Sequence, residues 1–391
     1  MKVLYILHST FEGAGSTKSF LAMLEGLMGK GVDVQVVVPD RNGIFNTLKN
    51  NHVTTCVLNY RSHVYPKFDS FTNALLFLPR LFLRLFLNRM AVSKLKKIVG
   101  NQHFDIIHTN VSVVNIGYVV ARKMGLKHVY HVREYGDLDF GFVYYPCRKN
   151  LLNQLNGGGS YSVCITKDIQ NHYGLINSKL SRVIYNGIIE KKDSDKLPDK
   201  DFDKRFFLYA GRIEEAKGVL DLIEAYLEYS KDNNSPLPLY LAGEINDKSY
   251  YNKILTKLHN NNLSKSVTFL GQVDNLDELM SKAWAIVIPS LNEGFGRCMA
   301  EAMSNGCLVV GRNTGGTKEQ FDNGLKLTGE EIGFRFENVD ELAKQMMMIG
   351  QMNVNDRGVY VNRAFHVVNQ LYTSDNNVNE IYMFYEDILA S

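Results

Sequence analysis

Cysteine is scarce in this sequence and its charge is nearly balanced, and both features exclude classes of protein. Only 5 of the 391 residues are cysteine, and no two of them are spaced as CxxC. This excludes a disulfide framework and a cysteine zinc site, and it favours reduced thiols in a cytoplasmic protein. The net charge of +3 is too small to indicate nucleic-acid binding, so we expect no nucleic-acid partner.

A long apolar leader is also missing. The apolar run in MKVLYILHST follows a single lysine and is too short for the hydrophobic region of a signal peptide, so it predicts a first β-strand. We therefore expect a cytoplasmic protein, with peripheral attachment to the inner face of the plasma membrane as one option.

The length of the chain, 391 residues, exceeds what one hydrophobic core normally spans, so two domains are expected. In the first half, short apolar runs alternate with helical stretches such as Ser16–Lys30. Several runs are continuous in Val, Ile and Leu, as in strands covered on both faces, and the β-α-β-α order predicts a parallel, doubly wound α/β sheet. The strands expected here are Val3–His8, Asp33–Pro39, Thr54–Leu58, Asp105–Thr109, Lys127–Arg133 and Tyr161–Thr166.

The second half repeats this pattern, with helices expected at Gly218–Ser230 and Asp274–Lys282. The charged stretch Asn186–Lys204 predicts an interdomain linker. We expect one domain over residues 1–185, a second over 186–365, and a helical tail over 366–391 that packs back on the first domain. The strands expected in this half are Arg182–Tyr185, Phe206–Ala210, Leu237–Ala242, Ser266–Leu270, Ala285–Pro289 and Leu308–Gly311.

Two carboxylates in the C-terminal third are placed for ligand binding. Glu293 follows a predicted strand, and open α/β sheets bind ligands beyond the carboxyl ends of their strands. Gly294 and Gly296 lack a Cβ, so backbone N–H groups there can approach an anion or a sugar oxygen. Glu301 lies in the helix that follows, where its carboxylate could accept from two vicinal ribose hydroxyls. The alternative is that Glu301 only forms a surface ion pair with Arg297, one helical turn earlier.

A second segment supplies positive charge. YAGRIEEAKG, residues 209–218, follows the predicted strand Phe206–Ala210 and opens a helix, so Arg212 and Lys217 project from one loop. Two cations there suit a departing diphosphate, on which negative charge builds as a glycosidic bond breaks. A nucleotide-activated sugar carries both the diphosphate and the hydroxyls that the two segments would bind.

The C-terminal half resembles the retaining glycosyltransferases of family 4, which have the GT-B fold. The resemblance implies two doubly wound, Rossmann-like domains facing across a cleft, with the nucleotide sugar mainly on the C-terminal domain and the acceptor on the N-terminal one. The motifs that carry it are VIYNGI (183–188), YAGRIEEAKG, LYLAGE (239–244), VTFLGQV (267–273), the Glu293 and Glu301 pair, and TGGTKE (314–319), with thinner matches at FEGAGSTKSF (11–20), FDIIHTN (104–110) and HVRE (131–134).

The resemblance assigns roles to individual residues. Glu293 would contact the hydroxyls of the donor sugar and Glu301 the ribose, while Arg212 and Lys217 would hold the diphosphate. The residues expected to be needed for catalysis are Glu293, His131, Arg212 and Lys217. Further donor contacts are expected at Gly15, Gln272, Val273, Gly294, Phe295, Gly296 and Arg297, although the Gly-Gly usual in this family at the first of these positions is here Gly15-Ser16.

His131 would reach the donor sugar from the N-terminal domain. The alternative is a satisfied structural histidine at the end of an apolar strand. A zinc site shared with His128 is not expected, because residues three apart on a strand face opposite sides. We expect neither a metal nor a cofactor.

Two further motifs are set aside. GAGSTKS resembles a phosphate-binding P-loop, but Thr17 and Glu12 stand where that motif needs glycine. Asp137-Leu138-Asp139 resembles the metal-binding DxD of the other glycosyltransferase fold, yet the same spacing recurs at 193–195 and 201–203.

One segment is both basic and strongly apolar. No Asp or Glu occurs from Ser70 to Phe104, and within this span Asn73–Lys97 is rich in Leu, Phe, Arg and Lys. Arg80, Arg84 and Asn88 form a narrow polar stripe at i, i+4 and i+8. Pro79 and the arginines interrupt it too often for it to cross a bilayer. It could lie in an anionic membrane interface, or it could be a helix buried in the N-terminal domain with its arginines at the solvent edge.

These observations predict a metal-independent, retaining glycosyltransferase that moves a hexose-type sugar from a nucleoside diphosphate sugar, UDP rather than GDP, to a glycan or lipid-linked glycan in surface polysaccharide synthesis. The alternatives are a sugar-nucleotide epimerase on the same fold and a non-catalytic GT-B binding subunit. An epimerase would need no acceptor, and the presence of all four charged residues argues against a non-catalytic subunit.

Overall fold

The chain forms two compact units, each built around one parallel sheet. The computed structural model describes residues 1–68, 70–157, 159–191, 197, 205–231, 233 and 235–391. Unit 1 comprises Met1–Gly187 together with Ser374–Ser391, and unit 2 comprises Ile188–Thr373. The predicted α/β class, with two Rossmann-like sheets in series, is confirmed.

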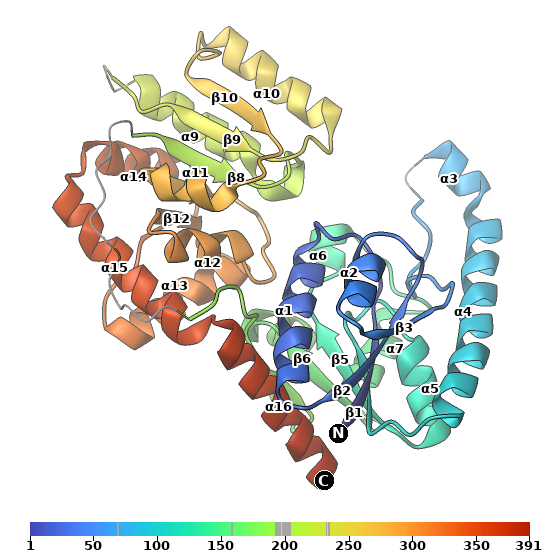
Figure 1. The fold of residues 1–391 in the computed structure, drawn as a ribbon. Helices are drawn as coiled ribbons and strands as arrows, with labels where there is room; N and C mark the ends of the chain where they lie inside the picture. The colour runs from blue at the N-terminus through green and yellow to red at the C-terminus, as the bar shows by residue number, and fades with distance from the viewer. Residues whose placement is uncertain (69, 158, 192–196, 198–204, 232, 234) are drawn as a thin grey trace. The chain divides into compact units, whose positions relative to one another are not determined.

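Unit 1 holds a seven-stranded parallel sheet in the order β3-β2-β1-β4-β5-β6-β7. Helices connect successive strands, and the last helix of the chain joins this unit (Figure 1). Its elements are β1 (Lys2–Ile6), α1 (Gly15–Gly29), β2 (Asp33–Val38), α2 (Ile44–Asn50), β3 (Thr54–Val57), α3 (Phe71–Leu75), α4 (Phe77–Gly100), β4 (Ile106–Thr109), α5 (Ile116–Met124), β5 (Lys127–Val132), α6 (Asp137–Phe140), α7 (Arg148–Leu155), β6 (Ser160–Cys164), α8 (Lys167–His172), β7 (Ser181–Val183) and α16 (Ser374–Ala390).

Unit 2 holds a six-stranded parallel sheet in the order β10-β9-β8-β11-β12-β13. Its elements are β8 (Phe207–Ala210), the 3-10 turn η1 (Glu215–Lys217), α9 (Val219–Lys231), β9 (Leu239–Ala242), α10 (Lys248–Asn260), β10 (Val267–Gly271), α11 (Leu276–Lys282), β11 (Ala285–Ile288), α12 (Arg297–Ser304), β12 (Leu308–Arg312), α13 (Gly315–Thr328), β13 (Phe334–Phe336), α14 (Val339–Gln351) and α15 (Val354–Leu371).

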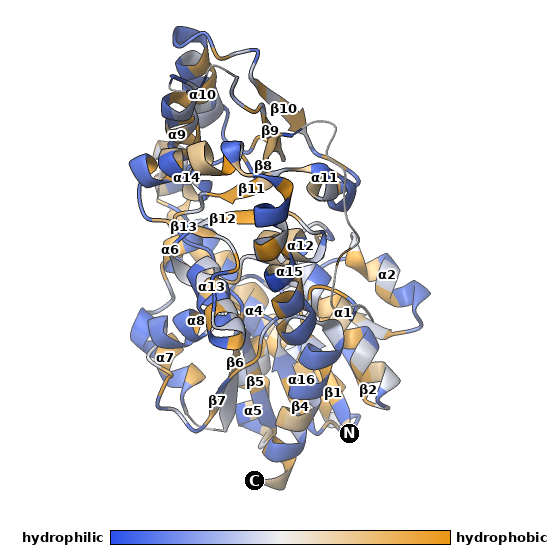
Figure 2. Cartoon of the chain, turned by 90° about the vertical axis from the view of Figure 1, so that its left-hand side faces the viewer, coloured by the Kyte–Doolittle hydropathy of each residue, from blue (hydrophilic) through white to orange (hydrophobic). Residues whose placement is uncertain are grey.

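The central strands are apolar because helices cover both faces of each sheet. β1 and β11 are almost entirely buried along their length, as expected of strands in parallel sheets. Figure 2 shows β11 and β12 coloured mainly as hydrophobic, whereas the surface helices carry polar residues. Trp284, next to β11, is fully buried in the core of unit 2.

Three features differ from the sequence expectations. The strand expected at Arg182–Tyr185 belongs to the first sheet as β7, although it was counted with the second half. The edge strand β13 was not predicted, since only three residues form it. The chain divides after Gly187 rather than after residue 185, and α15 belongs to unit 2 while α16 belongs to unit 1, so the expected tail over 366–391 is split between them. Much of the expected linker, 192–196 and 198–204, lies outside the described residues.

α16 closes the core of unit 1 against α1 and β1. Its residues Ile381, Tyr385 and Ile388 are buried in the same cluster as Tyr5 and Phe20. The Tyr5 and Tyr385 hydroxyls are 2.7 Å apart and hydrogen-bonded, although 380 residues separate them in the sequence. The last helix is therefore an integral part of this core.

The segment Asn73–Lys97 forms α3 and most of α4. The polar stripe expected on this helix does not lie at a solvent edge throughout, since Asn88 is buried and Arg84 donates to the carbonyl of Ser62 at 3.3 Å. The buried-helix alternative fits only the second half of α4, where Ala91, Leu95 and Val99 are buried. Among the described residues, no helix combines the length and apolarity needed to span a membrane.

Candidate active site

The candidate site of unit 2 lies at the carboxyl edge of the sheet, where the strand order reverses. β8 pairs with β11 in parallel, and the order then runs outward to β10 on one side and β13 on the other. Doubly wound sheets bind ligands at such a switch point. The loops that follow β8 and β11 carry Lys217 and Glu293, and Lys217 Nζ lies 2.8 Å from Glu293 Oε2.

Backbone contacts hold these two loops against each other. The amide of Leu291 donates to the carbonyl of Ala216 at 3.1 Å. Gly218 has a φ of 63°, and a Cβ there would lie 2.1 Å from the carbonyl oxygen of Pro289. Only glycine allows both this backbone conformation and this approach. The separation of Lys217 and Glu293 is thus fixed by backbone geometry as well as by their charges.

The loop that carries Glu293 is also held from α13. Gly316 donates its amide to the Glu293 carbonyl at 2.6 Å, and a Cβ on Gly316 would lie 2.6 Å from the Phe295 backbone. Gln320 Nε2 donates to the carbonyls of Phe295 and Gly296, the latter at 3.0 Å. Sequence reasoning matched the TGGTKE motif but assigned no role to Gly316 or Gln320, and the glycine pair in that motif was the available signal.

Gly296 ends this loop and begins α12. It is the N-cap residue, with a φ of 83° in the left-handed region, where glycine is favoured. The backbone amides at the start of an α-helix point out of its N-terminus, and the positive end of the helix dipole there favours an anion. Gly294, Phe295, Gly296 and Arg297 therefore form a backbone-lined turn next to Glu293.

The charges at the site act on common neighbours. Burial works to lower the pKa of Lys217, but the Glu293 carboxylate outweighs burial and the pKa is raised. Burial raises the pKa of the Cys298 thiol well above its usual value, and the negative charges of Glu301 and Glu293 add to this rise. The positive charge of Lys217 works to lower it, so Glu293, Glu301 and Lys217 all influence the pKa of this one thiol.

Arg212 completes the set from the same loop as Lys217. It forms an ion pair with Glu214 at 2.9 Å, and its side chain is 45% exposed. The Tyr209 hydroxyl donates to its carbonyl at 2.7 Å, which fixes the backbone at the end of β8. The Arg212 charge works to lower the pKa of Lys217, so the two cations act on the same region.

Glu301 is paired with Arg297 at 2.9 Å. The surface ion pair given as the alternative is therefore present. Both side chains remain partly exposed, so a ribose could share the Glu301 carboxylate with this arginine.

Gln272 and Val273 follow β10, at the edge of the sheet two strands from β8. Strands lie about 4.8 Å apart, so these residues stand roughly 10 Å across the sheet from the end of β8. Gln272 is exposed and Val273 half-buried. This spacing suits a ligand that extends along the carboxyl edge of the sheet.

Gly15 and His131, the two predicted site residues in unit 1, lie near the carboxyl edge of its sheet. Gly15 is the first residue of α1, after β1 at the switch point between β1 and β4. His131 lies in β5 and is fully buried. Its Nδ1 is 3.3 Å from His108 Nε2 and 3.3 Å from a nitrogen of Arg133.

The second ring nitrogen of His131, Nε2, is buried without a hydrogen-bond partner among the described residues. Burial, with the positive charge of Arg133, lowers the pKa of His131 well below its usual value. The ring is therefore neutral at physiological pH. Because it has no exposed surface, a contact with a ligand requires a neighbouring side chain to move.

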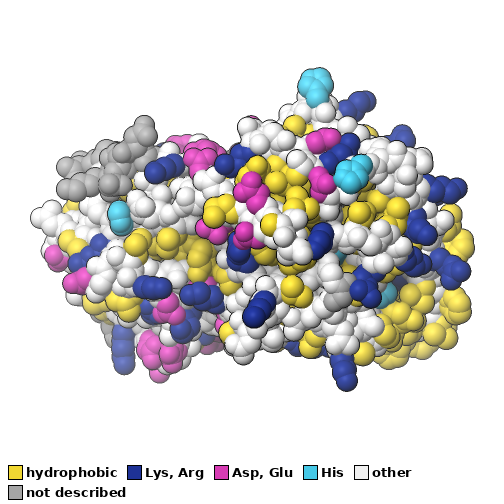
Figure 3. Space-filling view, turned by 90° about the horizontal axis from the view of Figure 1, so that it is seen from below, with side chains coloured by type: hydrophobic (Ala, Val, Ile, Leu, Met, Phe, Trp, Pro, Cys, Tyr) yellow, Lys and Arg dark blue, Asp and Glu magenta, His cyan; other side chains and the backbone are white. Residues whose placement is uncertain are grey.

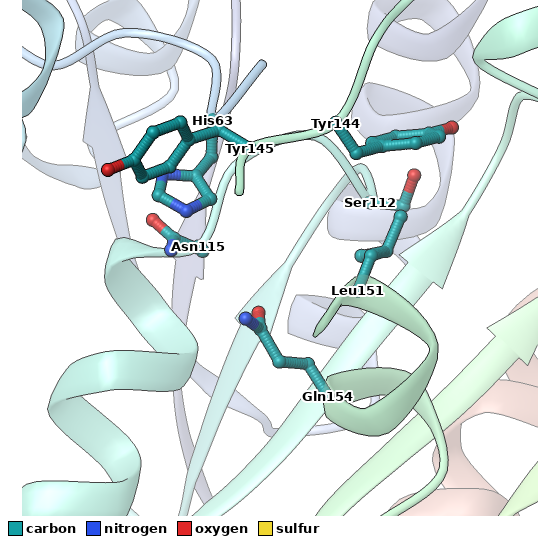
Figure 4. Close-up of a pocket in the computed structure, with 7 residues that line it drawn as sticks. All are labelled: His63, Ser112, Asn115, Tyr144, Tyr145, Leu151 and Gln154. Atoms are coloured by element: carbon teal, nitrogen blue, oxygen red, sulfur yellow. The ribbon is translucent and has the colours of Figure 1, made fainter. Parts of the chain in front are cut away.

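The loops 60–67 and 135–145 meet within unit 1. Val64 and Tyr144 form an antiparallel bridge, and the amide of Tyr65 donates to the Val143 carbonyl at 2.7 Å. Between these loops, β4 and α7 lies a cavity of about 10 Å³, the space of about one water molecule. Figure 4 shows its lining: His63, Ser112, Asn115, Tyr144, Tyr145, Leu151 and Gln154.

The aspartates of the DxD pattern at 137–139 have protein partners. Asp137 pairs with Arg148 and, at 2.8 Å, with His172. Asp139 accepts from the amides of Tyr135 and Gly136. The other two occurrences lie outside the described residues, and among those described no group of three His, Cys, Asp or Glu side chains is arranged to hold a metal.

Two family models match successive parts of the chain. Residues 13–192 match the model "Glycosyltransferase Family 4", and residues 190–357 match "Glycosyl transferases group 1". The chain belongs to the glycosyltransferases of the GT-B, family 4 type. It therefore transfers a sugar from a nucleotide-sugar donor.

Two proteins of similar sequence agree with this family assignment. A glycosyltransferase of Methanocaldococcus jannaschii is 26% identical over 306 residues, which cover 73% of this chain and 76% of the relative. N-acetyl-alpha-D-glucosaminyl L-malate synthase of Bacillus anthracis is 24% identical over 231 residues, 57% of this chain and 55% of the relative.

Solved structures share the fold along the whole chain. Anabaena HepE, solved in complex with UDP, has a TM-score of 0.76 at 18% identity, with coverage of 99% of this chain and 100% of that one. Staphylococcus aureus TarM, solved with UDP, alpha-GlcNAc-glycerol and fondaparinux, has a TM-score of 0.72 at 14% identity and covers both chains completely.

Proposed function

We propose that this glycosyltransferase moves a hexose-type sugar from a UDP-sugar to a glycan or lipid-linked glycan, with retention at the anomeric carbon and without a metal ion. The observation that carries the proposal is the Lys217–Glu293 pair at the switch point of unit 2, next to the amides that begin α12. A cation, backbone donors and a carboxylate close together would suit the binding of a sugar diphosphate. We propose UDP rather than GDP as the nucleotide of the donor because the similar Anabaena and Staphylococcus proteins were solved with UDP.

Lys217 and Arg212 would stabilise the leaving diphosphate. As the bond between the anomeric carbon and the phosphate oxygen breaks, negative charge grows on that oxygen, and fixed cations stabilise it more than they stabilise the ground state. These cations could supply the charge that a metal supplies in other enzymes. On Lys217 the Glu293 carboxylate outweighs burial and keeps the ammonium charged.

Glu293 would bind hydroxyls of the donor sugar, and Glu301 the ribose. A carboxylate that is already paired with a cation stays ionised and can accept two hydroxyl hydrogen bonds through its remaining lone pairs. Retention would follow from attack on the face from which the diphosphate departs, with a phosphate oxygen taking the proton of the acceptor hydroxyl.

The acceptor would bind unit 1, through loops 60–67 and 135–145. Gly15, at the start of α1, would contact the diphosphate, and His131 would contact the donor sugar. The unpartnered Nε2 of His131 is the atom that such a contact would satisfy. Surface polysaccharide synthesis would be the setting for such an acceptor.

Replacing Glu293 tests the proposal. Glu293→Gln keeps the shape of the side chain but removes its charge, and we expect transfer to fall by on the order of 10² to 10⁴. Glu215→Gln is the matched control, because Glu215 is exposed and lies in the same loop as Lys217. The transfer rates of both variants are measured as the release of nucleoside diphosphate from a panel of UDP- and GDP-sugars, with membrane extracts supplying the acceptor. Equal rates in the Glu293→Gln variant and the wild type would refute the assignment.

A further inference from the structure

The outer surface of α3 and of the first half of α4 is apolar. The exposed fractions are 72% for Phe68, 86% for Phe71, 71% for Leu75, 74% for Phe82 and 60% for Phe86. Leu76, Leu78, Leu83 and Met90 are exposed beside them. Monomeric proteins seldom leave so many large apolar side chains together on one surface, and such patches mark contact sites.

Contacts on the opposite side hold α4 in this orientation. Asn88 is buried, accepts from the amide of Arg61 at 2.8 Å and donates to its carbonyl at 3.0 Å. Arg84 donates to the carbonyls of Ser62 and Val64. Further along, Leu95 is fully buried. The first half of the helix therefore directs Arg84 and Asn88 into unit 1 and its phenylalanines Phe82 and Phe86 outward, which is the reverse of an ordinary surface helix.

The exposed charges along α4 are all positive. Arg89, Lys94, Lys96 and Lys97 are exposed on the second half of the helix, and no Asp or Glu occurs from Ser70 to Phe104. Figure 3 shows hydrophobic side chains beside Lys and Arg along the edge of the molecule on the side where α4 lies in Figure 1. The surface thus combines an apolar part at its start with a basic part at its end.

We propose that this α3–α4 surface (residues 70–97 with Phe68) docks on an anionic lipid bilayer, with the helix lying in the interface. Apolar side chains in contact with acyl chains and lysines in contact with lipid phosphates are the two contributions that hold interfacial helices. A second copy of the chain is disfavoured as the occupant. It would bring two sets of four cations together with no acidic residue in either segment.

The docking surface adjoins the loop that would bind the acceptor. The ring of Tyr65 stacks on that of Phe77 with centroids 6.0 Å apart, and α4 bonds directly to residues 61–64. If the proposed function holds, a bilayer seated on α4 would present a lipid-linked acceptor beside loop 60–67. The lipid contact itself does not depend on that function.

Vesicle flotation of the purified full chain tests the proposal without any activity. We expect the protein to float with vesicles of phosphatidylcholine mixed with phosphatidylglycerol and to stay behind with phosphatidylcholine alone. Binding should weaken as salt is raised, because exposed charges are screened. Wild-type protein that stays behind with both kinds of vesicle at low salt overturns the proposal.

Two variants separate the contributions. The first is the triple variant Lys94→Gln, Lys96→Gln and Lys97→Gln. Its partition into the anionic vesicles should be lower by roughly fivefold per lysine, on the order of a hundredfold in all. Phe82→Ser with Phe86→Ser should lower it by at least about tenfold. Partition of either variant equal to that of the wild type contradicts the proposal.

Each variant has a matched control on unit 2. The triple change Lys248→Gln, Lys253→Gln and Lys265→Gln removes the same charge from exposed positions, and Leu325→Ser with Leu327→Ser removes exposed apolar residues. Both controls should float as the wild type does. If the phenylalanine variant breaks a dimer of the wild type while vesicles bind neither, the surface pairs copies of the chain and the lipid proposal is wrong.

Discussion

Lys217 Nζ lies 2.8 Å from Glu293 Oε2, although 76 residues separate the two in the sequence. They meet because β8 and β11 are adjacent parallel strands and each residue follows the carboxyl end of its strand. About one fifth of each side chain remains exposed. The pair is therefore a partly exposed charged feature at the carboxyl edge of the sheet rather than a fully buried structural bridge.

Glu301→Gln should weaken nucleoside binding selectively. If its carboxylate binds the ribose, the affinity for UDP should fall by about tenfold, the loss of one charge-assisted hydrogen bond, while pyrophosphate binds as before. Competition titrations with UDP and pyrophosphate measure both. Arg297→Gln is the control, because it breaks the same ion pair without removing the carboxylate. If Glu301→Gln binds UDP as tightly as the wild type does, Glu301 does not bind the ribose and serves only in the ion pair with Arg297.

Gly218→Ala should damage the site through the backbone. The φ of 63° is strained for alanine by about 1–2 kcal/mol, and the new Cβ would meet the Pro289 carbonyl. We expect a lower free energy of unfolding and weaker donor binding, because Lys217 is the preceding residue.

Gly358→Ala is the matched control for this change. It lies in α15 with open space around its Cβ position, and helix interiors favour alanine by about 0.5–1 kcal/mol. Thermal unfolding should move down for Gly218→Ala and up for Gly358→Ala. A Gly218→Ala variant as stable as the control would show that the loop adapts freely.

Unit 1 should lose stability in acid because it buries several neutral histidines. Burial lowers the pKa of His63 to about 4 and that of His128 to about 3, and burial with the charge of Arg133 lowers that of His8 to about 4. Each folded-state pKa lies below the unfolded value, so the unfolded state binds protons first. The full free energy of unfolding is therefore retained above about pH 6.5. It falls as the pH drops toward 4, by up to about 1.4 kcal/mol per pH unit and per histidine.

Pulse proteolysis between pH 7 and 4.5, with the cut sites mapped, would locate this loss in unit 1. His63→Gln should flatten the dependence, whereas His52→Gln, at an exposed position, should not. Equal resistance of unit 1 at both ends of the range would contradict the prediction.

Glu134→Gln should have the opposite pH dependence. Burial raises the pKa of Glu134 to about 7, against the hydrogen bonds that its Oε1 accepts from Ser112. Ionisation of Glu134 alone therefore lowers the free energy of unfolding by up to about 3 kcal/mol as the pH rises from 4.5 to 7, which opposes the contribution of the histidines. Glutamine keeps an acceptor for Ser112 without the charge. Its unfolding temperature should match the wild type at pH 5 and exceed it at pH 8, and a variant less stable at both would argue against this cause.

The proximity of Lys217 and Glu293 could be predicted from the sequence because strand order and loop position are local signals. Apolar runs located β8 and β11, and the charged residues followed them directly. The supports from Gly316 and Gln320 could not be predicted, since they depend on how α13 packs against the Glu293 loop. The placement of α16 in unit 1 rests on contacts such as Tyr5 with Tyr385, which no local pattern reveals.

The orientation of α4 shows a further limit. Periodicity located the stripe of Arg80, Arg84 and Asn88 but could not say which face turns inward. The ordinary rule would place arginines toward solvent. Here the backbone groups of Arg61 and Ser62 need partners, and Asn88 and Arg84 supply them.

The central claim is tested most directly by calorimetric titration of the wild type and of Lys217→Ala with UDP and UDP-glucose, in the presence of a chelator and with GDP and a GDP-sugar for comparison. We predict that a UDP ligand binds the wild type saturably and that Lys217→Ala weakens this binding by about ten- to a hundredfold. The control Lys282→Ala, which removes the lysine of the exposed pair with Glu278, should leave the affinity unchanged. Equal affinity of the wild type and Lys217→Ala would contradict the claim.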